Sequence, residues 1–193
     1  MITHIAGKLV EKNPTDVVID CNGVGYLLNI SLNTFSQIPD QEFLKLYSHL
    51  IVREDSHTLY GFASIAEREI FKLLISVSGI GASTARIMLS SLTPQQVKEG
   101  IAHGDVALIQ SVKGIGAKTA ARVILDLKDK VLKVYDIDEV SVNTNNTNKD
   151  EALSALEVLG FAKKQAERVI GKVVAQKPEA NVETIIKEAL KNL

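Results

Sequence analysis

The chain has 193 residues, of which 46% are hydrophobic, so it is long enough to bury one or more cores. Its 22 basic and 23 acidic residues give a net charge of −1, so bulk charge does not indicate a nucleic-acid partner. The charge is unevenly placed, however: residues 1–62 carry 4 basic and 7 acidic side chains, residues 63–135 carry 10 and 6, and residues 136–193 carry 8 and 10. The positive charge is therefore concentrated in the middle of the chain.

The sequence contains a single cysteine, Cys21, which cannot form an internal disulfide. No apolar run approaches the roughly 18 to 20 residues that span a bilayer, and the first residues lack the order of a secretion signal. We therefore expect a soluble, cytoplasmic protein.

Residues 1–63 are predicted to form a small β-barrel. Short runs rich in Val, Ile, Leu and Tyr alternate there with turn residues, and Asn22-Gly23 lies between two such runs, where both residues tolerate the positive φ of a tight hairpin. Five short strands suit a closed barrel of the OB type. The expected strands lie near 2–12, 15–21, 24–31, 43–52 and 57–62.

The hydrophobic period changes at Ser64, so residues 64–135 are predicted to be helical. Ser64 and Glu67 read as a capping box that opens a helix to about Val77, and Thr93 with Pro94 opens another. After Gly116 an apolar stripe recurs at helical spacing. It consists of Ala120, Val123, Ile124, Leu127 and Val131.

Beyond the helical region, residues 136–149 end in an asparagine-rich polar tract that predicts a flexible linker. Residues 150–193 then show three short amphipathic helices. Because so short a unit has a marginal core, part of its apolar surface is expected to serve a partner. The predicted fold class is therefore α+β: a barrel, a helical domain, a linker and a C-terminal three-helix domain.

One stretch occurs twice. Residues 76–85 (SVSGIGASTA) and 111–120 (SVKGIGAKTA) agree at eight of ten positions. A Walker loop needs an adjoining Gly-Lys-Ser/Thr, but Ala117 separates Gly116 from Lys118. A dinucleotide fingerprint needs a third glycine, and this position holds Thr84 or Thr119. Neither type of nucleotide loop is therefore predicted.

A sharp turn between two helices remains as the interpretation of each copy. Glycine permits positive φ and leaves no side chain to keep a ligand from the backbone. The next helix begins with unpaired N–H groups at the positive end of its dipole, where a phosphodiester oxygen would bind without any reading of bases. The alternative is that these are only tight turns in a packed domain. Two near-identical copies in the basic segment favour the DNA-backbone interpretation.

These turns look like a tandem helix-hairpin-helix, and the segment VREDSHTLYGF at 52–62 precedes them. With the barrel, linker and three-helix tail, the whole chain resembles the RuvA family, the Holliday-junction-binding subunits of the bacterial branch-migration complex. The resemblance implies an N-terminal OB barrel and a homotetramer, alone or as two stacked tetramers, that binds four-way junction DNA. It also implies the RuvB hexameric ATPase as a partner, RuvC resolvase in the same pathway, no cofactor or metal, no membrane partner and no catalytic residue.

The resemblance also assigns roles to individual residues. The DNA-binding residues would be Gly79, Gly81, Ser83, Thr84, Gly114, Gly116, Lys118, Thr119 and Arg122. Glu54 and Asp55 would form an acidic pin that repels phosphates at the crossover, and apolar residues of the tail would dock the ATPase: Leu156, Leu159 and Phe161.

Two other functions stay open at this point. Helix-hairpin-helix units also occur in nucleases and glycosylases, although only Asp126 and Asp129 follow the second copy as candidate acids. The barrel could instead bind single strands by stacking bases on its aromatic residues, for which core packing is the competing interpretation. These residues are Tyr26, Phe35, Phe43, Tyr47, Tyr60 and Phe62.

Overall fold

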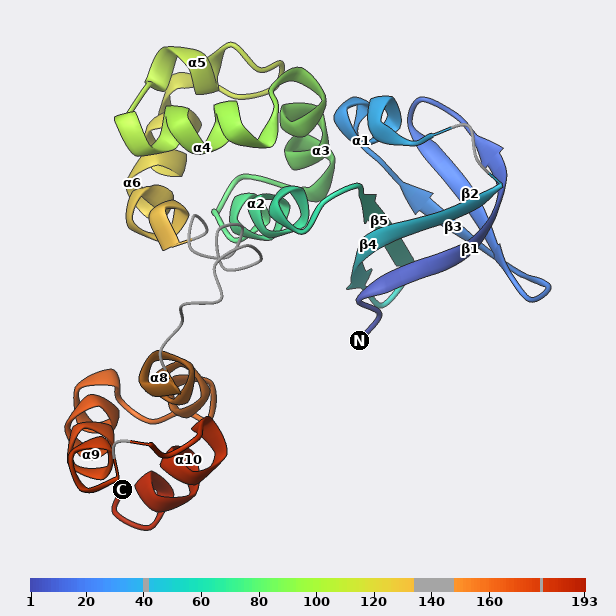
Figure 1. The fold of residues 1–193 in the computed structure, drawn as a ribbon. Helices are drawn as coiled ribbons and strands as arrows, with labels where there is room; N and C mark the ends of the chain where they lie inside the picture. Colours follow the sequence, from blue (N-terminus) through green and yellow to red (C-terminus); the bar gives the residue numbers. More distant parts are fainter. Residues whose placement is uncertain (40–41, 134–147, 178) are drawn as a thin grey trace. The chain divides into compact units, whose positions relative to one another are not determined.

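The computed structural model describes residues 1–39, 42–133, 148–177 and 179–193. The chain divides after residue 138 into two compact units, shown in Figure 1. Of the predicted linker at 136–149, residues 136–147 lie outside the described residues, and Asn148 and Lys149 already belong to helix α8 (Asn148–Val158).

A closed five-stranded barrel opens the N-terminal unit and confirms the predicted fold. The strand order is β1-β2-β3-β5-β4, and antiparallel pairing of β1 with β4 closes the barrel. The β3–β5 pair is parallel and short, with Leu28 opposite Leu59 and Asn29 opposite Tyr60. The strands are β1 (His4–Lys12), β2 (Asp16–Cys21), β3 (Val24–Asn29), β4 (Phe43–Val52) and β5 (His57–Phe62).

The predicted hairpin turn between β2 and β3 is present. Asn22 has φ 55° and Gly23 has φ 90°, the pair of positive values that a tight two-residue turn requires. A short helix that the sequence pattern did not indicate, α1 (Leu32–Gln37), follows β3. Its N-cap is Ser31, whose Oγ accepts from the N–H of Thr34.

Five helices in the described ranges complete the N-terminal unit, and the first of them packs against β4 and β5 of the barrel (Figure 1). Phe71 lies 4.9 Å from the ring of Tyr60 and 5.0 Å from that of Phe62, so β5 shares a hydrophobic core with the helices. This shared core fixes the helical hairpins relative to the barrel. The helices are α2 (Ile65–Ile75), α3 (Ala82–Ser91), α4 (Pro94–His103), α5 (Val106–Gln110) and α6 (Ala117–Lys133).

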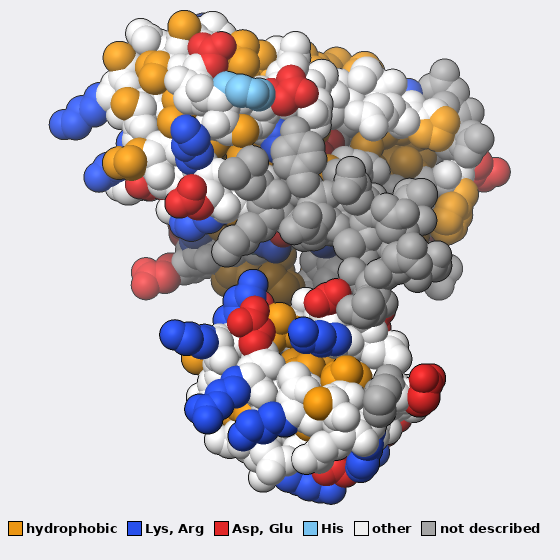
Figure 2. All heavy atoms as spheres, turned by 60° about the vertical axis from the view of Figure 1, so that its left-hand side comes forward, with side chains coloured by type: hydrophobic (Ala, Val, Ile, Leu, Met, Phe, Trp, Pro, Cys, Tyr) orange, Lys and Arg blue, Asp and Glu red, His pale blue; other side chains and the backbone are white. Residues whose placement is uncertain are grey.

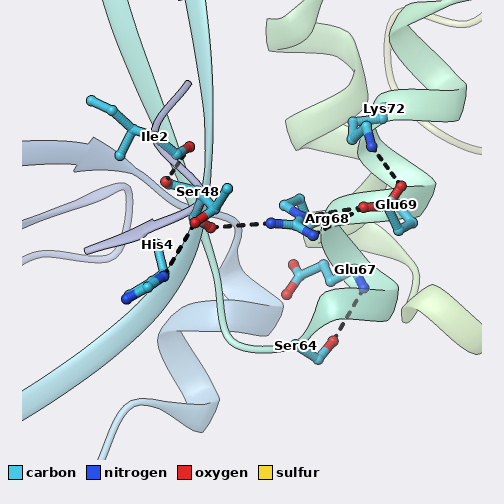
Figure 3. Close-up of polar contacts among 9 residues, drawn as sticks. Ile2, His4, Ser48, Ser64, Glu67, Arg68, Glu69 and Lys72 are labelled. Carbon is cyan, nitrogen blue, oxygen red and sulfur yellow. Dashed lines mark hydrogen bonds and ion pairs between the residues drawn. The ribbon is translucent and has the colours of Figure 1, made fainter. Parts of the chain in front are cut away.

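The capping box predicted at the start of α2 is only half formed. Ser64 Oγ accepts from the N–H of Glu67, as Figure 3 shows, but the Glu67 carboxylate does not return to the cap. It is fully buried and accepts hydrogen bonds from Ser31 Oγ and Thr34 Oγ1, at 2.5 and 2.6 Å. Glu67 therefore joins the α2 start to the α1 cap of the barrel.

The next residues of α2 strengthen the same junction. The Arg68 guanidinium donates to the Thr3 carbonyl oxygen at 3.1 Å. Arg68 and Lys72 also form ion pairs with Glu69, at 3.2 and 2.7 Å. Because these ion pairs are partly exposed, we expect them to stabilise the junction less than the buried Glu67 hydrogen bonds do.

Replacement of Glu67 by glutamine is expected to lower the free energy of unfolding by about 1–3 kcal/mol. The two hydroxyls donate to different carboxylate oxygens, and in glutamine one of these oxygens becomes an NH2 group that can only donate. Urea unfolding followed by circular dichroism measures this loss. Glu99→Gln is the matched control, since Glu99 is exposed on α4 and should change stability by less than about 0.5 kcal/mol. Equal losses in the two variants would show that the buried carboxylate has no special role.

The described residues of the C-terminal unit form three helices, as predicted: α8, α9 (Lys163–Gln176) and α10 (Val182–Leu190). Gly160, with φ 95°, follows the end of α8. No helix in the described part of the chain is long and apolar enough to cross a membrane. The buried core of this unit consists of Ala152, Leu156, Ala166, Val169, Ile170, Val173, Ile185 and Ala189.

Candidate nucleic-acid interface

The repeated sequence forms the same helix-turn-helix twice. The first hairpin joins α2 to α3 and the second joins α5 to α6. Corresponding residues have corresponding exposures: Val77 and Val112 are both 2% exposed, while Ile80 and Ile115 are both 5% exposed. The flanking glycines of both turns are exposed. The isoleucine of each Gly-Ile-Gly therefore anchors the turn in the core while the glycines face outward.

Backbone hydrogen bonds hold the two turns in the same way. The N–H of Ile80 donates to the Val77 carbonyl at 3.0 Å, and the N–H of Ile115 donates to the Val112 carbonyl at 3.1 Å. A serine hydroxyl also donates to a carbonyl oxygen of the last helical turn before each hairpin. Ser76 Oγ donates to the Leu73 carbonyl and Ser111 Oγ to the Leu108 carbonyl, both at 2.7 Å. The repeat in sequence is thus a repeat in backbone geometry.

The four glycines have two different roles, which the sequence alone did not separate. Gly79 (φ 96°) and Gly114 (φ 92°) adopt the left-handed conformation that other residues rarely take. Gly81 is extended, with φ −85°, and Gly116 is not among the residues with positive φ. A Cβ at Gly81 or Gly116 would meet no atom within 4 Å, so their lack of a side chain leaves open space beside the helix starts.

Backbone N–H groups at the starts of α3 and α6 are unpaired. In the first hydrogen bond of each helix, the N–H of Ala85 donates to the Gly81 carbonyl and the N–H of Ala120 donates to the Gly116 carbonyl, both at 2.9 Å. The N–H groups of 81–84 and 116–119 have no acceptor in the described ranges. By contrast, side chains cap α2, α4 and α5 of the same unit. Two sets of free amide donors therefore lie at the positive ends of helix dipoles, a geometry suited to an anionic oxygen.

Side chains around the two helix starts add polar groups. Ser83, Lys118 and Arg122 are exposed, while Thr84 and Thr119 are half-buried. Lys118 and Arg122 form no ion pair with any residue that the structure describes. The predicted DNA-binding residues are therefore brought together as two accessible clusters, one per hairpin.

Glu54 and Asp55 lie at the tip of the β4–β5 hairpin, and both are exposed. The N–H of Arg53 donates to the Ser56 carbonyl at 2.8 Å and closes this turn. Ser56 Oγ also donates to Asp55 Oδ1 at 3.2 Å. The two carboxylates thus extend from a hydrogen-bonded turn. The exposed Arg53 beside them adds a positive charge whose effect the sequence interpretation did not consider.

The barrel aromatics do not assemble into an exposed stacking surface. Tyr60 and Phe62 are buried, Tyr26, Phe35 and Tyr47 are half-buried, and Phe43 is 66% exposed. This arrangement supports core packing over base stacking for most of them.

His49 lies at the junction of the barrel and α2 and packs against the hydrophobic core. The His49 ring lies 5.8 Å from the Phe71 ring in an edge-on geometry. Burial lowers the pKa of His49, and the nearby charges of Lys72 and Arg68 lower this pKa further. Within the described ranges, no group of three or more His, Cys, Asp or Glu side chains could hold a metal ion.

The apolar residues predicted to dock a partner differ in accessibility. Leu156 is fully buried in the C-terminal core, so its side chain is not available to a partner. Leu159 is 59% exposed, and Phe161 is half-buried against the core. Val158, which the sequence interpretation missed, is 87% exposed. The C-terminal unit occupies the lower part of Figure 2, and on its visible face hydrophobic side chains lie between Lys and Arg side chains.

Comparisons with known proteins cover the whole chain. The family models described as "RuvA N terminal domain", "SAM-like Helix-hairpin-helix tandem" and "RuvA, C-terminal domain" match residues 1–61, 71–129 and 147–193. A protein of Flavobacterium psychrophilum named Holliday junction branch migration complex subunit RuvA is 67% identical over 193 residues, the full length of both chains. This chain belongs to the RuvA family.

Two further RuvA relatives carry the same name. The protein of Christiangramia forsetii is also 67% identical over 193 residues and over the full length of both chains. The protein of Cytophaga hutchinsonii is 47% identical over 197 residues, covering 99% of each chain. Membership of the RuvA family therefore rests on the barrel, the helical hairpins and the C-terminal helices together.

Proposed function

We propose that this chain binds four-way Holliday junctions by their shape, independently of sequence, and recruits the RuvB ATPase for branch migration in recombination and DNA repair in the cytoplasm. Full-length similarity to proteins named as Holliday junction branch migration complex subunits supports this function. The observation that carries the proposal is the pair of equivalent hairpins, each with unpaired amide donors in the most basic segment of the chain.

The binding step follows from the geometry of the hairpins. Phosphate oxygens would accept from the free N–H groups at the starts of α3 and α6, where Gly81 and Gly116 allow close approach. Lys118 and Arg122 would add charge-assisted contacts at the second hairpin. Because every nucleotide carries the same phosphate, these contacts fix the position of a duplex without selecting its sequence.

Selectivity for four arms would come from assembly. Four copies around one axis would present eight hairpins, and only four diverging duplexes could occupy all of them. One such homotetramer, or two stacked on opposite faces of the DNA, would hold the junction open and square for the RuvB ATPase and for RuvC resolvase. The chain itself would act as a non-catalytic subunit.

Glu54 and Asp55 would act by repulsion at the centre of such an assembly. Like charges repel more strongly where DNA excludes water, so four acidic tips would keep phosphates apart at the crossover and help strands separate. The β4–β5 hairpin would carry these charges toward the DNA without requiring any enzymatic group.

The double variant Glu54→Gln with Asp55→Asn is expected to bind a synthetic four-way junction as tightly as the unmodified chain or more tightly, because it removes repulsion. A gel-shift titration measures the affinity, and the Glu99→Gln variant controls for loss of a distant exposed carboxylate. A large loss of affinity on neutralising these two carboxylates would argue against the repulsive role.

Competition between DNA shapes tests the function itself. The unmodified chain should bind a four-way junction more tightly than linear duplex of equal length, and should be almost indifferent to sequence. Affinity should fall steeply with salt, by roughly 0.9 in log K per unit log salt for each phosphate neutralised. Equal affinity for the linear duplex would contradict the proposal, and cleavage of the junction in magnesium would favour a nuclease.

A further inference from the structure

The two hairpins have the same backbone but different charge. At three exposed positions the second hairpin carries a basic side chain where the first does not. Lys113 corresponds to Ser78, Lys118 to Ser83, and Arg122 to Ile87, each pair at the same spacing of 35 residues. Ile87 is 42% exposed, so an apolar side chain reaches solvent in the first hairpin where a guanidinium does in the second.

The surroundings do not compensate for this difference. Lys113, Lys118 and Arg122 form no ion pair with any described residue. The first turn of α6 contains no acidic side chain, and Asp126, four residues after Arg122, forms no ion pair with it. All three positive charges therefore remain available to an anionic partner.

The first hairpin has one basic residue on α3, and this residue is directed elsewhere. Arg86 donates to the Thr15 carbonyl at 3.2 Å and to Asn29 Oδ1 at 2.9 Å, both in the barrel. Its guanidinium thus fixes α3 to the barrel. The start of α3 then offers only backbone N–H groups and the hydroxyls of Ser83 and Thr84 to a ligand.

We propose that the two hairpins divide the work of holding each DNA arm: the second supplies the electrostatic part of the affinity, and the first is a charge-free clasp made of amides and hydroxyls. This division rests on the proposed function, because it assumes that both hairpins face phosphates. Counterion release makes the second hairpin responsible for most of the salt dependence, while contacts of the first hairpin change little with salt. Lys113 would bind phosphate together with Lys118 and Arg122.

A reciprocal exchange tests this division. One variant gives the second hairpin the side chains of the first, by Lys113→Ser, Lys118→Ser and Arg122→Ile. Its slope of log K against log salt for a four-way junction is expected to become shallower by about 2.7 per bound subunit, at about 0.9 for each lost phosphate contact. The opposite variant, Ser78→Lys, Ser83→Lys and Ile87→Arg, is expected to steepen the slope by a similar amount.

A third variant removes the same charge from the C-terminal unit, which does not contain the hairpins. Lys163, Lys164 and Arg168 are exposed on α9, and their replacement by Ser, Ser and Ile should leave the slope unchanged. An unaltered slope in the first variant, or in the opposite one, would overturn the division of roles, provided that the unmodified chain prefers the junction. Absence of that preference in the unmodified chain would instead overturn the proposed function. Thermal unfolding of each variant checks that the exposed substitutions leave the fold intact.

Discussion

Replacing Gly79 and Gly114 together by valine is expected to weaken binding of a four-way junction by at least about 100-fold. Both residues have φ above 90°, where a side chain costs roughly 1–2 kcal/mol per residue and a β-branched one costs more. Each turn would relax to another backbone conformation, and the N–H groups at the starts of α3 and α6 would no longer point toward one phosphate oxygen. Loss of a hydrogen bond to a charged group costs about 1.5–3 kcal/mol, so two weakened hairpins account for the expected factor.

Gly23→Val separates loss of the hairpins from general destabilisation. Gly23 also has φ near 90° and open space around a Cβ, but it lies in the β2–β3 turn of the barrel. This variant should lose stability to a similar extent per substitution and keep its junction affinity. Equal losses of affinity in the two variants would show that strain alone, rather than the hairpin amides, weakens binding.

Substitution of Val158 and Leu159 by aspartate is expected to reduce binding to the RuvB ATPase by at least about 30-fold, because exposed apolar anchors at interfaces contribute about 2 kcal/mol or more. Both side chains are exposed on the C-terminal unit, at 87% and 59%, so neither is needed in its core. Junction affinity should not change, because the hairpins belong to the other unit. A pull-down or interferometry titration against the purified ATPase measures the effect.

Two controls distinguish an apolar docking surface from other causes. Lys163→Asp with Lys164→Asp alters charge on α9 of the same unit and should leave ATPase binding within a few-fold of the unmodified chain. Leu156→Ala should instead lower the stability of this unit, by about 2–5 kcal/mol, since Leu156 is fully buried. Unchanged ATPase binding after the loss of Val158 and Leu159 would contradict the assignment.

Local patterns in the sequence were sufficient for most of the fold. Alternating apolar runs predicted all five strands because each strand has one buried face, and the Asn22-Gly23 pair predicted its turn because few residues adopt positive φ. The repeat predicted two equivalent turns, because the same short-range contacts of Ile80 and Ile115 fix them.

Contacts between distant segments explain what the sequence pattern could not predict. Glu67 has the spacing of a capping box, but its carboxylate binds hydroxyls more than thirty residues earlier in the chain. The sequence pattern places Leu156 on the apolar face of its helix but does not show whether the core or a partner covers that face. In the structure, the packing of α9 and α10 buries it completely. Gly79 and Gly81 have distinct roles because their φ angles differ, and the sequence does not specify the φ of a glycine.

Amide hydrogen exchange at the two hairpins tests most directly whether free backbone donors hold the DNA. Exchange would be measured by mass spectrometry with and without a saturating four-way junction. Slower exchange at residues 79–84 and 114–119, with α9 and α10 unchanged, is the predicted result. Unaltered exchange at both turns while the junction is bound would contradict the account.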